Sequence, residues 1–375
     1  VQGWVLAGDV RAAEPLPPFP AATVDGFAVV ASDGPSARRI VGDQFAGYDA
    51  ALRLQPGQAA RITTGAPVPD GADAIMMVEW SREEEGRVSF TRSVKAGDFI
   101  RPIGSDIAEG EVILTHGTRL GAAEIGLLAT AGATIVEVHR RPIVGVMSTG
   151  DELVEPDEPP GPGQIRDSNR FSLMAAVREA GAEPVDLGIA PDTWGALLAF
   201  IESGLDRCDA LLTSGGVSMG ELDLVKPLLE QRGRVHFGRV NTKPGKPVTF
   251  ATLHDKPFFA MPGNPVSSLV SFEIFVRPAF RKMSGLPEPQ WQRPRVPAIL
   301  ERAARHTANR TEFQRATLRY DPGDRHFYAR TTGSQQSSRL LSMIGANALI
   351  VLPHGKADFE EGEEVETIMI GESQS

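Results

Sequence analysis

The sequence has little that could form a disulfide or hold a transition metal. One cysteine, Cys208, occurs in 375 residues, so no disulfide can form within the chain. A single cysteine suits a reducing compartment, and we expect a cytosolic protein. The seven histidines are scattered, without an HxxxH or HxH pair, so a site built mainly from Cys or His is not expected. Any metal ion should be held by oxygen ligands or by a substrate.

Long apolar runs and an excess of positive charge are also absent. No apolar stretch reaches the ~20 residues that span a bilayer, and no basic-then-apolar leader follows Val1, so we expect neither membrane insertion nor a signal peptide. The formal net charge of −10 argues against a nucleic-acid or anionic-membrane surface. Local Lys, Arg and backbone N–H groups would have to attract an anionic substrate against this field.

Residue patterns divide the chain into parts of different class. Residues 29–107 are typical of short β segments, and 115–133 are typical of one helix rich in small residues. From residue 142, short apolar runs alternate with amphipathic helices, which predicts a mostly parallel sheet covered on both faces. After about residue 287 the pattern is β again. We therefore predict an α/β plus β multidomain protein with a central doubly wound α/β domain.

Polar, glycine-bearing segments follow four of the predicted strands. They are STGDEL (148–153), TSGGVSMGELD (213–223), NTKPGKP (241–247) and MPGNPVSS (261–268). Ligands of open parallel sheets bind beyond the carboxyl ends of the strands, so these segments should converge on one site.

Two of these segments are typical of anion sites. Adjacent glycines at 215–216 let backbone N–H groups approach an oxyanion, with hydroxyls from Ser214 and Ser218, although a plain strand-to-helix turn would carry them too. Lys243 and Lys246 flank a Pro-Gly turn, and two close ammonium groups repel each other unless an anion lies between them. On a solvated surface the same pair would mean little.

The remaining polar residues leave alternatives open. Asp223 is either a helix cap or an Mg²⁺ ligand, and Asp151 and Glu152 either hold a cation or water or cap their loop. The segment PGNPVS predicts a helix capped by Asn264, whose free N–H groups suit an anion beside Ser267. Arg166 either pairs with Asp151 or touches the ligand.

Eight strings in this order resemble one family over essentially the whole chain. They are PPFPAATVDGFAV (17–29), RITTGAPVPDGADAIMMVE (61–79), IRPIGSDIAEGEVIL (100–114), STGDELV, GQIRDSN, SGGVSMGELD, KPGKP and MPGNPVS. The sequence is similar to the molybdopterin molybdenumtransferases, which include bacterial MoeA-type proteins and the E domain of gephyrin.

The resemblance implies a four-part architecture and a homodimer. It predicts an elongated dimerisation subdomain from 1–28 and 108–140, an inserted β-rich subdomain at 29–107, an α/β molybdopterin-binding subdomain at 141–286 and a C-terminal β-barrel at 287–375. In the family each active site combines the α/β and C-terminal parts of one chain with the inserted part of the other. Family members begin with a further helix, which we expect this chain to lack.

The resemblance also implies an Mg²⁺-dependent reaction. Adenylylated molybdopterin is hydrolysed, AMP leaves, and molybdate is the substrate that places molybdenum on the dithiolene. A molybdopterin adenylyltransferase domain is the implied partner. Two alternatives remain open: a gephyrin-like receptor-clustering scaffold, and the related adenylyltransferase itself.

Motif by motif, the resemblance implies residue roles. Molybdate contacts are expected at Lys243, Lys246, Pro247, Ser267, Arg310 and Ser338, where Arg315 and Ser337 could exchange roles with the last two. Asp223 is the expected Mg²⁺ ligand, and the family also needs Asp25, Thr64, Asp106, Glu152 and Asp192, whose individual roles are open. Further substrate contacts are expected at Thr149, Asp151, Ser214, Gly215, Gly216, Ser218, Pro262, Gly263 and Asn264.

Overall fold

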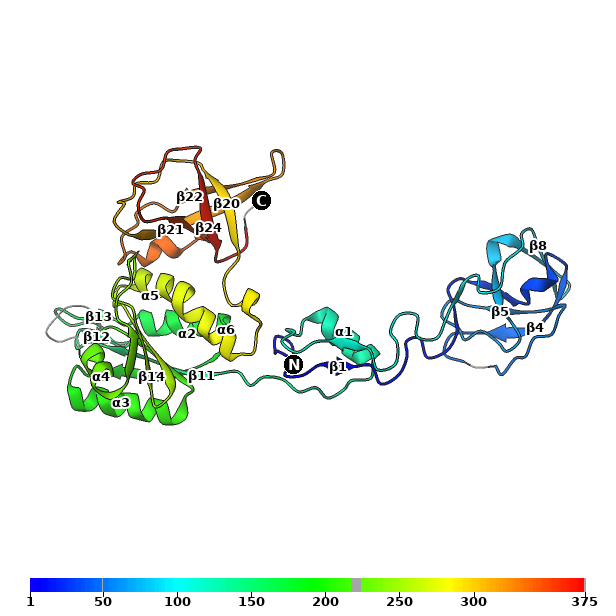
Figure 1. Ribbon diagram of the computed structural model, residues 1–375, viewed down its shortest axis with the longest axis horizontal. Coiled ribbons are helices and arrows are strands. Elements are labelled where there is room, and N and C mark those ends of the chain that lie inside the picture. Colours follow the sequence, from blue (N-terminus) through cyan, green and yellow to red (C-terminus); the bar gives the residue numbers. More distant parts are fainter. Residues whose placement is uncertain (49, 217–223, 374–375) are drawn as a thin grey trace. The chain divides into compact units, whose positions relative to one another are not determined.

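The computed structural model describes residues 1–48, 50–216 and 224–373 (Figure 1). Contacts divide the chain into two units, Val1–Gln2 with Leu6–Val138 and Gly3–Val5 with His139–Ser375. The finer division into four subdomains stays a prediction. Among the described residues, no helix is both long and apolar enough to cross a membrane.

The first unit contains a six-stranded sheet in the order β6-β3-β5-β4-β8-β7. Its strands are β3 (Gly26–Val29), β4 (Arg38–Gln44), β5 (Gln58–Ile62), β6 (Ala74–Met77), β7 (Ser81–Glu84) and β8 (Arg87–Phe90). Neighbouring residues of β6 face opposite sides, because Ile75 and Met76 enter two different apolar clusters. The charged run SREEEG forms the β7–β8 hairpin.

The same unit contains paired extended segments and one helix. β1 (Val10–Arg11) pairs with β10 (Val112–Leu114), β2 (Ala21–Ala22) pairs with β9 (Ile100–Arg101), and α1 covers Ala122–Thr130. The prediction of one helix over 115–133 was wrong at both ends. Gly121 is the N-cap residue, and its N–H donates to the Glu124 carboxylate at 2.9 Å, so the helix begins only there.

The second unit begins with the predicted doubly wound sheet, in the order β14-β11-β15-β19-β18-β16. Its strands are β11 (Ile143–Thr149), β14 (Glu183–Ala190), β15 (Ala210–Ser214), β16 (Arg234–Phe237), β18 (Thr249–Leu253) and β19 (Lys256–Met261). The first four strands in that order are parallel, and β18 is antiparallel to both of its neighbours. A small ladder joins β12 (Leu153–Val154) to β13 (Ile165–Arg166).

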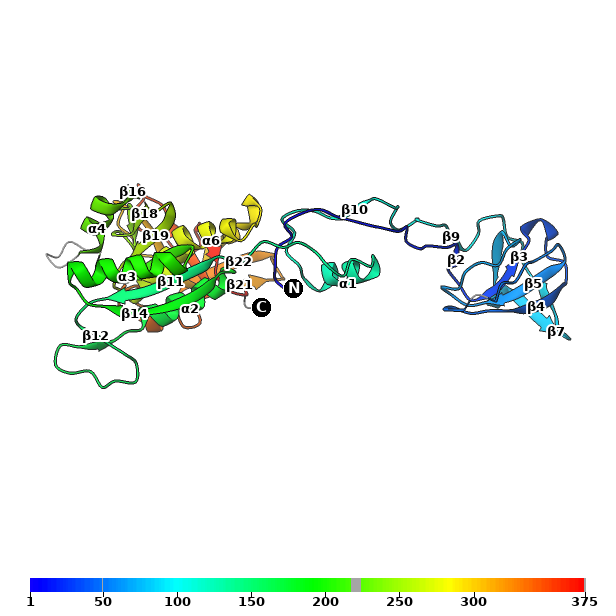
Figure 2. The same cartoon turned by 90° about the horizontal axis from the view of Figure 1, so that it is seen from below.

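Helices cover both faces of this sheet (Figures 1 and 2). α2 (Asn169–Glu179) lies on one face with α5 (Pro265–Ser271), which continues through a π-helical turn (Phe272–Val276) into α6 (Arg277–Met283). α3 (Trp194–Arg207) and α4 (Val225–Arg232) pack on the other face. Because a buried apolar cluster lies on each face of the sheet, the sequences of its parallel strands are continuous apolar runs.

A closed five-stranded barrel follows. It consists of β20 (Arg295–Leu300), β21 (Thr311–Asp321), β22 (His326–Thr331), β23 (Ala348–Leu352) and β24 (Glu364–Met369), and the pairing of β21 with β23 closes it. A short strand from the α/β part, β17 (Thr242–Lys243), pairs with β21 in parallel. Val266 and Val270 of α5 pack against Phe313 and Leu349 of the barrel. These contacts hold the 241–247 segment against the barrel.

Candidate functional site

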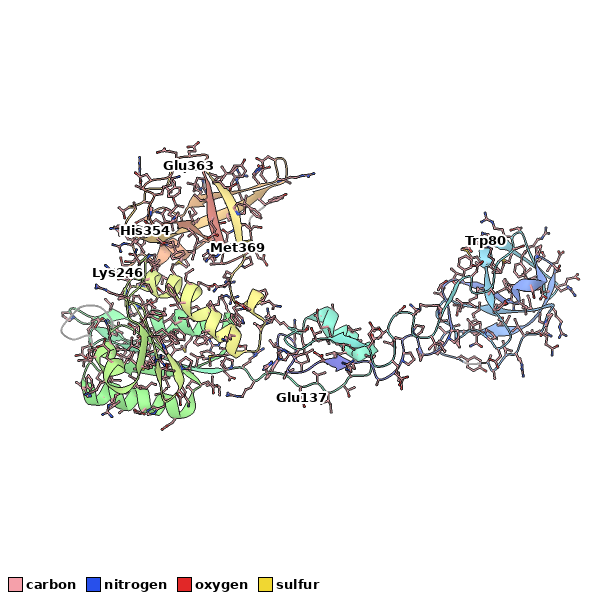
Figure 3. The ribbon with its side chains drawn as sticks, in the orientation of Figure 1. Trp80, Glu137, Lys246, His354, Glu363 and Met369 are labelled. Atoms are coloured by element: carbon pink, nitrogen blue, oxygen red, sulfur yellow. The ribbon has the colours of Figure 1, made fainter. Side chains whose placement is uncertain are left out.

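A pocket of about 630 Å³ lies where β17 meets the barrel. Three groups of residues line it: 242–247, Ser267 with Arg310, and 335–338. Lys246 lies between the α/β layers and the barrel (Figure 3). The volume is in the range of small-molecule sites, and all six residues expected to contact molybdate line this one pocket.

Three cationic side chains enter the pocket, and they differ in how they are paired. Lys243 Nζ lies 3.0 Å from Glu312 Oε1. In the part of the chain that the structure describes, the side chains of Lys246 and Arg310 have no hydrogen-bond or ion-pair partner. Like charges around one cavity repel each other, so an anion between them would relieve the repulsion.

The turn between the two lysines is held tightly. Gly245 has φ +98°, and a Cβ placed on it would lie 2.1 Å from Ser271 Oγ. Val240 N–H donates to the Lys246 carbonyl at 3.0 Å, and Val248 N–H donates to the Gly245 carbonyl at 3.2 Å. Only glycine can adopt this left-handed backbone and also leave room for the close approach of α5. The resulting turn fixes the direction in which the chain leaves it at each lysine.

A buried arginine supports the barrel loop of the pocket. Arg315 is 1% exposed and donates to the carbonyls of Ser334 and Gln336, each at 3.3 Å. Burial lowers its pKa to about 10, although the nearby Glu312 carboxylate opposes this shift. Of the two arginines left open by the sequence, the structure therefore places Arg310 at the pocket and Arg315 behind its wall.

The loop also meets the start of α5. Asn264 donates its side-chain amide to Ser337 Oγ at 3.2 Å, and Val266 N–H donates to the Ser337 carbonyl at 3.1 Å. The expectation that α5 offers its first N–H groups to an anion is therefore wrong for Val266. Asn264 does occupy the N-cap position, but its side chain bonds across to the barrel loop and makes no cap hydrogen bond. Ser337 and Ser338 both line the pocket.

The expected substrate residues at the strand ends lie together. Asn169, at the start of α2, donates its side-chain amide to Ser214 Oγ and to the Gly263 carbonyl, both at 2.7 Å. Gly215 N–H donates to the Met261 carbonyl at 3.1 Å. Gly215 has φ +94°, and a Cβ on it would lie 2.4 Å from the Thr149 carbonyl oxygen. The ends of β11, β15 and β19 thus converge, and Pro262, Gly263 and Asn264 lead from them to the barrel loop.

Comparison with known proteins identifies the family. Three family models match successive stretches: the MoeA N-terminal region (domains I and II) at residues 1–132, a probable molybdopterin binding domain at 145–282, and the MoeA C-terminal region (domain IV) at 297–370. A molybdopterin molybdenumtransferase of Nostoc is 37% identical, over 97% of this chain and 85% of that protein. The chain belongs to the molybdopterin molybdenumtransferase family.

Other relatives agree with this membership. Gephyrin of Dictyostelium discoideum is 39% identical over 98% of this chain, and the match spans 58% of that longer protein. Two structures of a molybdopterin biosynthesis MoeA protein from Pyrococcus horikoshii are 31% and 30% identical, with TM-scores of 0.85 and 0.82. They cover 99% and 98% of this chain, and each match covers 92% of the solved chain. The multidomain α/β plus β fold predicted from the sequence is therefore confirmed.

The acidic residues expected from the resemblance lie in several separate surroundings. Asp192 accepts a hydrogen bond from Thr149 Oγ1, and its N–H lies 3.3 Å from Asp151 Oδ1. Asp151 and Glu152 are exposed. Arg166 Nε donates to the Pro156 carbonyl at 2.8 Å, and among the described residues no ion pair joins Arg166 to Asp151. Asp223 and Ser218 lie outside the described residues, so their roles stay predictions.

Two further expected residues form one contact in the first unit. Thr64 donates both its N–H, at 2.7 Å, and its hydroxyl, at 2.9 Å, to Asp25 Oδ1. These two hydrogen bonds hold the pKa of Asp25 below its usual value. Asp106 pairs with Arg101 at 3.1 Å. Asp25 thus anchors the TTGAP loop, whereas the sequence had left its role open.

Replacing Asp25 by alanine is expected to loosen this loop. The Thr64 amide should exchange its hydrogen about tenfold faster, because a charge-assisted hydrogen bond that protects it is lost. In the unchanged protein the same release is expected only as the pH falls through the lowered pKa of Asp25, since protonation removes the acceptor charge. Hydrogen exchange followed by mass spectrometry measures both effects. The exposed Asp70, replaced in the same way, is the control, and equal exchange in the two variants would disprove the anchoring role.

Sequence reasoning missed three polar residues of this region. Gln335 and Gln336 line the pocket, and Glu312 pairs with Lys243. A signal for Glu312 was present in the sequence. It is a charged residue within the strand pattern TEFQRATLRY, two residues beyond Arg310, where alternate residues of an extended strand share a face.

Proposed function

We propose that this chain binds molybdate in the pocket beside β17 and transfers its molybdenum to the dithiolene of molybdopterin, releasing AMP from the adenylylated form. The observation that carries the proposal is that Lys246 and Arg310, two cations with no partner among the described residues, line one cavity together with the buried Ser267. A tetrahedral dianion accepts hydrogen bonds on all its oxygens, and these donors reach it from three different segments.

The strand ends would hold the second reactant. Gly216, Gly263 and Asn264 lie at the carboxyl edge of the sheet, where their backbone N–H groups suit the phosphates of an adenylylated pterin. Asn264 directly follows Gly263 at this edge and donates its side-chain amide to Ser337 of the barrel loop, so the proposed pyrophosphate site would adjoin the molybdate pocket. Water attacks the phosphoanhydride, AMP leaves, and the freed pterin meets molybdate at the adjoining pocket.

Magnesium is part of the proposal. Among the described residues no group of three or more His, Cys, Asp and Glu side chains could hold a metal ion. Mg²⁺ bound with phosphates needs only one or two protein carboxylates, and Asp223 is the residue we expect to supply one. When bound, the ion would neutralise charge on the anhydride oxygens. We also propose a homodimer, and a molybdopterin adenylyltransferase domain as the source of the substrate.

Incubating the protein with adenylylated molybdopterin, Mg²⁺ and molybdate tests the reaction. We expect AMP release that depends on molybdate, together with a product that activates an apo-molybdoenzyme. Incubation with ATP and unadenylylated pterin separates the alternative activity, because only an adenylyltransferase would consume ATP. Consumption of ATP without molybdate-dependent AMP release would contradict the proposal.

Replacing Asp223 by alanine should separate binding from hydrolysis. AMP release is expected to fall by about a hundredfold or more, because a carboxylate that holds a catalytic cation is lost. Molybdate binding, measured by titration calorimetry, should persist because its donors lie elsewhere. If the variant loses molybdate binding and keeps AMP release, the assignment of Asp223 is wrong.

A further inference from the structure

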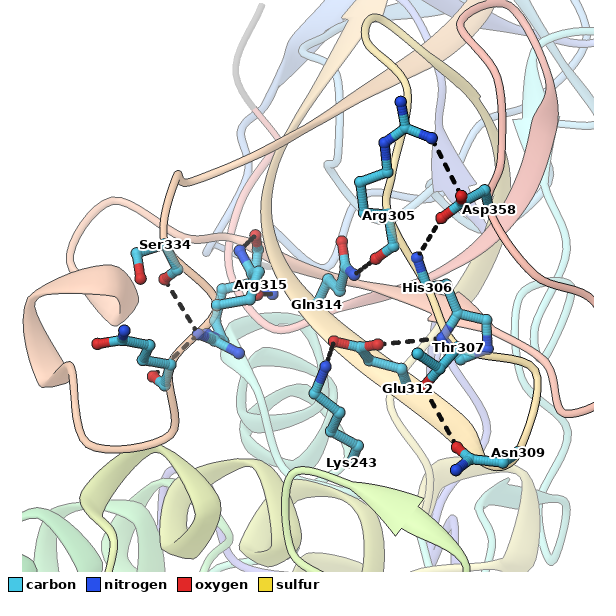
Figure 4. Close-up of polar contacts among 12 residues, drawn as sticks. Lys243, Arg305, His306, Thr307, Asn309, Glu312, Gln314, Arg315, Ser334 and Asp358 are labelled. Carbon is cyan, nitrogen blue, oxygen red and sulfur yellow. Dashed lines mark hydrogen bonds and ion pairs between the residues drawn. The ribbon is translucent and has the colours of Figure 1, made fainter.

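A buried carboxylate stands behind one of the three pocket cations (Figure 4). Glu312 is 2% exposed, and its Oε1 lies 3.0 Å from Lys243 Nζ. Strand register fixes the pair, because β17 and β21 place Lys243 directly opposite Glu312. The negative charge of Glu312 therefore holds the Lys243 ammonium at the pocket wall. The same charge competes with any bound anion for that ammonium.

The second oxygen of this carboxylate faces a buried histidine. His306 Nδ1 lies 3.0 Å from Glu312 Oε2, and Nε2 lies 3.3 Å from the Pro353 carbonyl oxygen. The imidazole ring is fully buried. A carboxylate oxygen only accepts, so the ring donates from Nδ1 to the second oxygen of Glu312.

Other charges around His306 come from the neighbouring loops. Asp358 accepts the His306 backbone N–H at 2.8 Å and pairs with Arg305 at 3.0 Å (Figure 4). These two hydrogen bonds lower the pKa of Asp358. Asp358 thus contacts the His306 backbone and Arg305, whereas the imidazole ring itself contacts Glu312.

We propose that Glu312 and His306 set the effective charge of the anion pocket. Glu312 is a positioning residue that holds Lys243 and competes with molybdate for it, and the hydrogen bond from His306 Nδ1 to the second carboxylate oxygen weakens that competition. This inference rests on the proposed molybdate site and adds a pair of residues that touch no substrate.

Two substitutions test this relation. Glu312→Gln keeps an acceptor for Lys243 and removes the competing charge, so molybdate should bind roughly three- to tenfold more tightly. His306→Leu removes the hydrogen bond to Glu312, so molybdate should bind more weakly by a similar factor. In the double variant the affinity should match that of Glu312→Gln alone, because the carboxylate on which His306 acts is then absent. Titration calorimetry with molybdate measures Kd, and the KM for molybdate should move in the same direction.

A matched pair on the surface provides the control. His254 Nε2 lies 3.0 Å from Glu202 Oε2, and both side chains are largely exposed. Glu202→Gln should leave the molybdate Kd unchanged. Thermal unfolding checks that each variant is folded. If His306→Leu does not fold, the sign of the Glu312→Gln effect decides alone, since a damaged pocket cannot bind more tightly.

The outcomes separate this inference from the proposed function. If both single variants bind molybdate more weakly and their losses add, the two residues are structural and the inference is overturned while the molybdate site stands. If the unchanged protein does not bind molybdate, the proposed function and this inference both fail. Opposite shifts, with the double variant matching Glu312→Gln, support the inference.

Discussion

Replacing Lys246 by alanine is expected to weaken molybdate binding by about ten- to a hundredfold and to lower AMP release accordingly. A charge-assisted hydrogen bond to an ionised group contributes roughly 1.5–3 kcal/mol, and each 1.4 kcal/mol is a factor of ten. Lys246 should carry the full effect because, among the described residues, its ammonium has no partner to release. The Lys243 ammonium, in contrast, is already paired with the Glu312 carboxylate.

The matched control for this substitution is Lys282→Ala. Lys282 is exposed near the end of α6 in the same unit and lies over the Trp291 ring at 5.0 Å. Titration calorimetry with molybdate and the AMP-release assay compare the two variants at equal ionic strength, since exposed charges are screened by salt. Equal molybdate affinity in the two variants would show that Lys246 does not contact the anion.

The second large effect is expected at Gly245. A Cβ at this position would lie 2.1 Å from Ser271 Oγ, and the residue has φ +98°. Gly245→Ala should therefore cost about 2 kcal/mol or more in the free energy of unfolding, from left-handed strain together with the displacement of α5 from the turn. Molybdate affinity should fall as well, because the turn aims both lysines.

Two further variants separate strain from collision. Gly355 has the same φ of +98° with no atom within 4 Å of its Cβ position, so Gly355→Ala carries the backbone strain alone. Ser271 Oγ is buried and has no hydrogen-bond partner in the described structure, so Ser271→Ala should cost little by itself. Combined with Gly245→Ala it should recover the part of the loss that exceeds Gly355→Ala. Denaturant unfolding gives all four free energies, and a Gly245→Ala loss no larger than that of Gly355→Ala would contradict the close approach.

Much of the architecture could be predicted from local pattern. Alternating apolar runs and amphipathic helices indicate a covered parallel sheet, and this sheet fixes which loops converge. The helix predicted over 115–133 failed because small residues suit both helix and extended chain, and only the contact of Glu124 with the Gly121 N–H fixes the start. A pattern of composition cannot reveal such a contact.

The site was predictable where a motif lies on one segment and uncertain where two segments meet. Lys243, Lys246 and Ser267 follow from their own loops. The choice between Arg310, which precedes β21, and Arg315, which lies within it, depends on a contact between two segments, because the Arg315 guanidinium donates to the carbonyls of Ser334 and Gln336. The pairing of Lys243 with Glu312 depends on a two-residue strand joining the barrel across about seventy residues of sequence, which no local periodicity encodes.

The central claim is that one pocket gathers the donors that hold molybdate. A crystal structure of the protein with molybdate, with the metal located by anomalous scattering at the molybdenum edge, tests it most directly. We predict one strong peak in the cavity beside β17, within hydrogen-bonding distance, through its oxygens, of Lys246, Arg310 and Ser267. A peak of equal strength elsewhere, with this cavity empty at a saturating concentration of molybdate, would contradict the account.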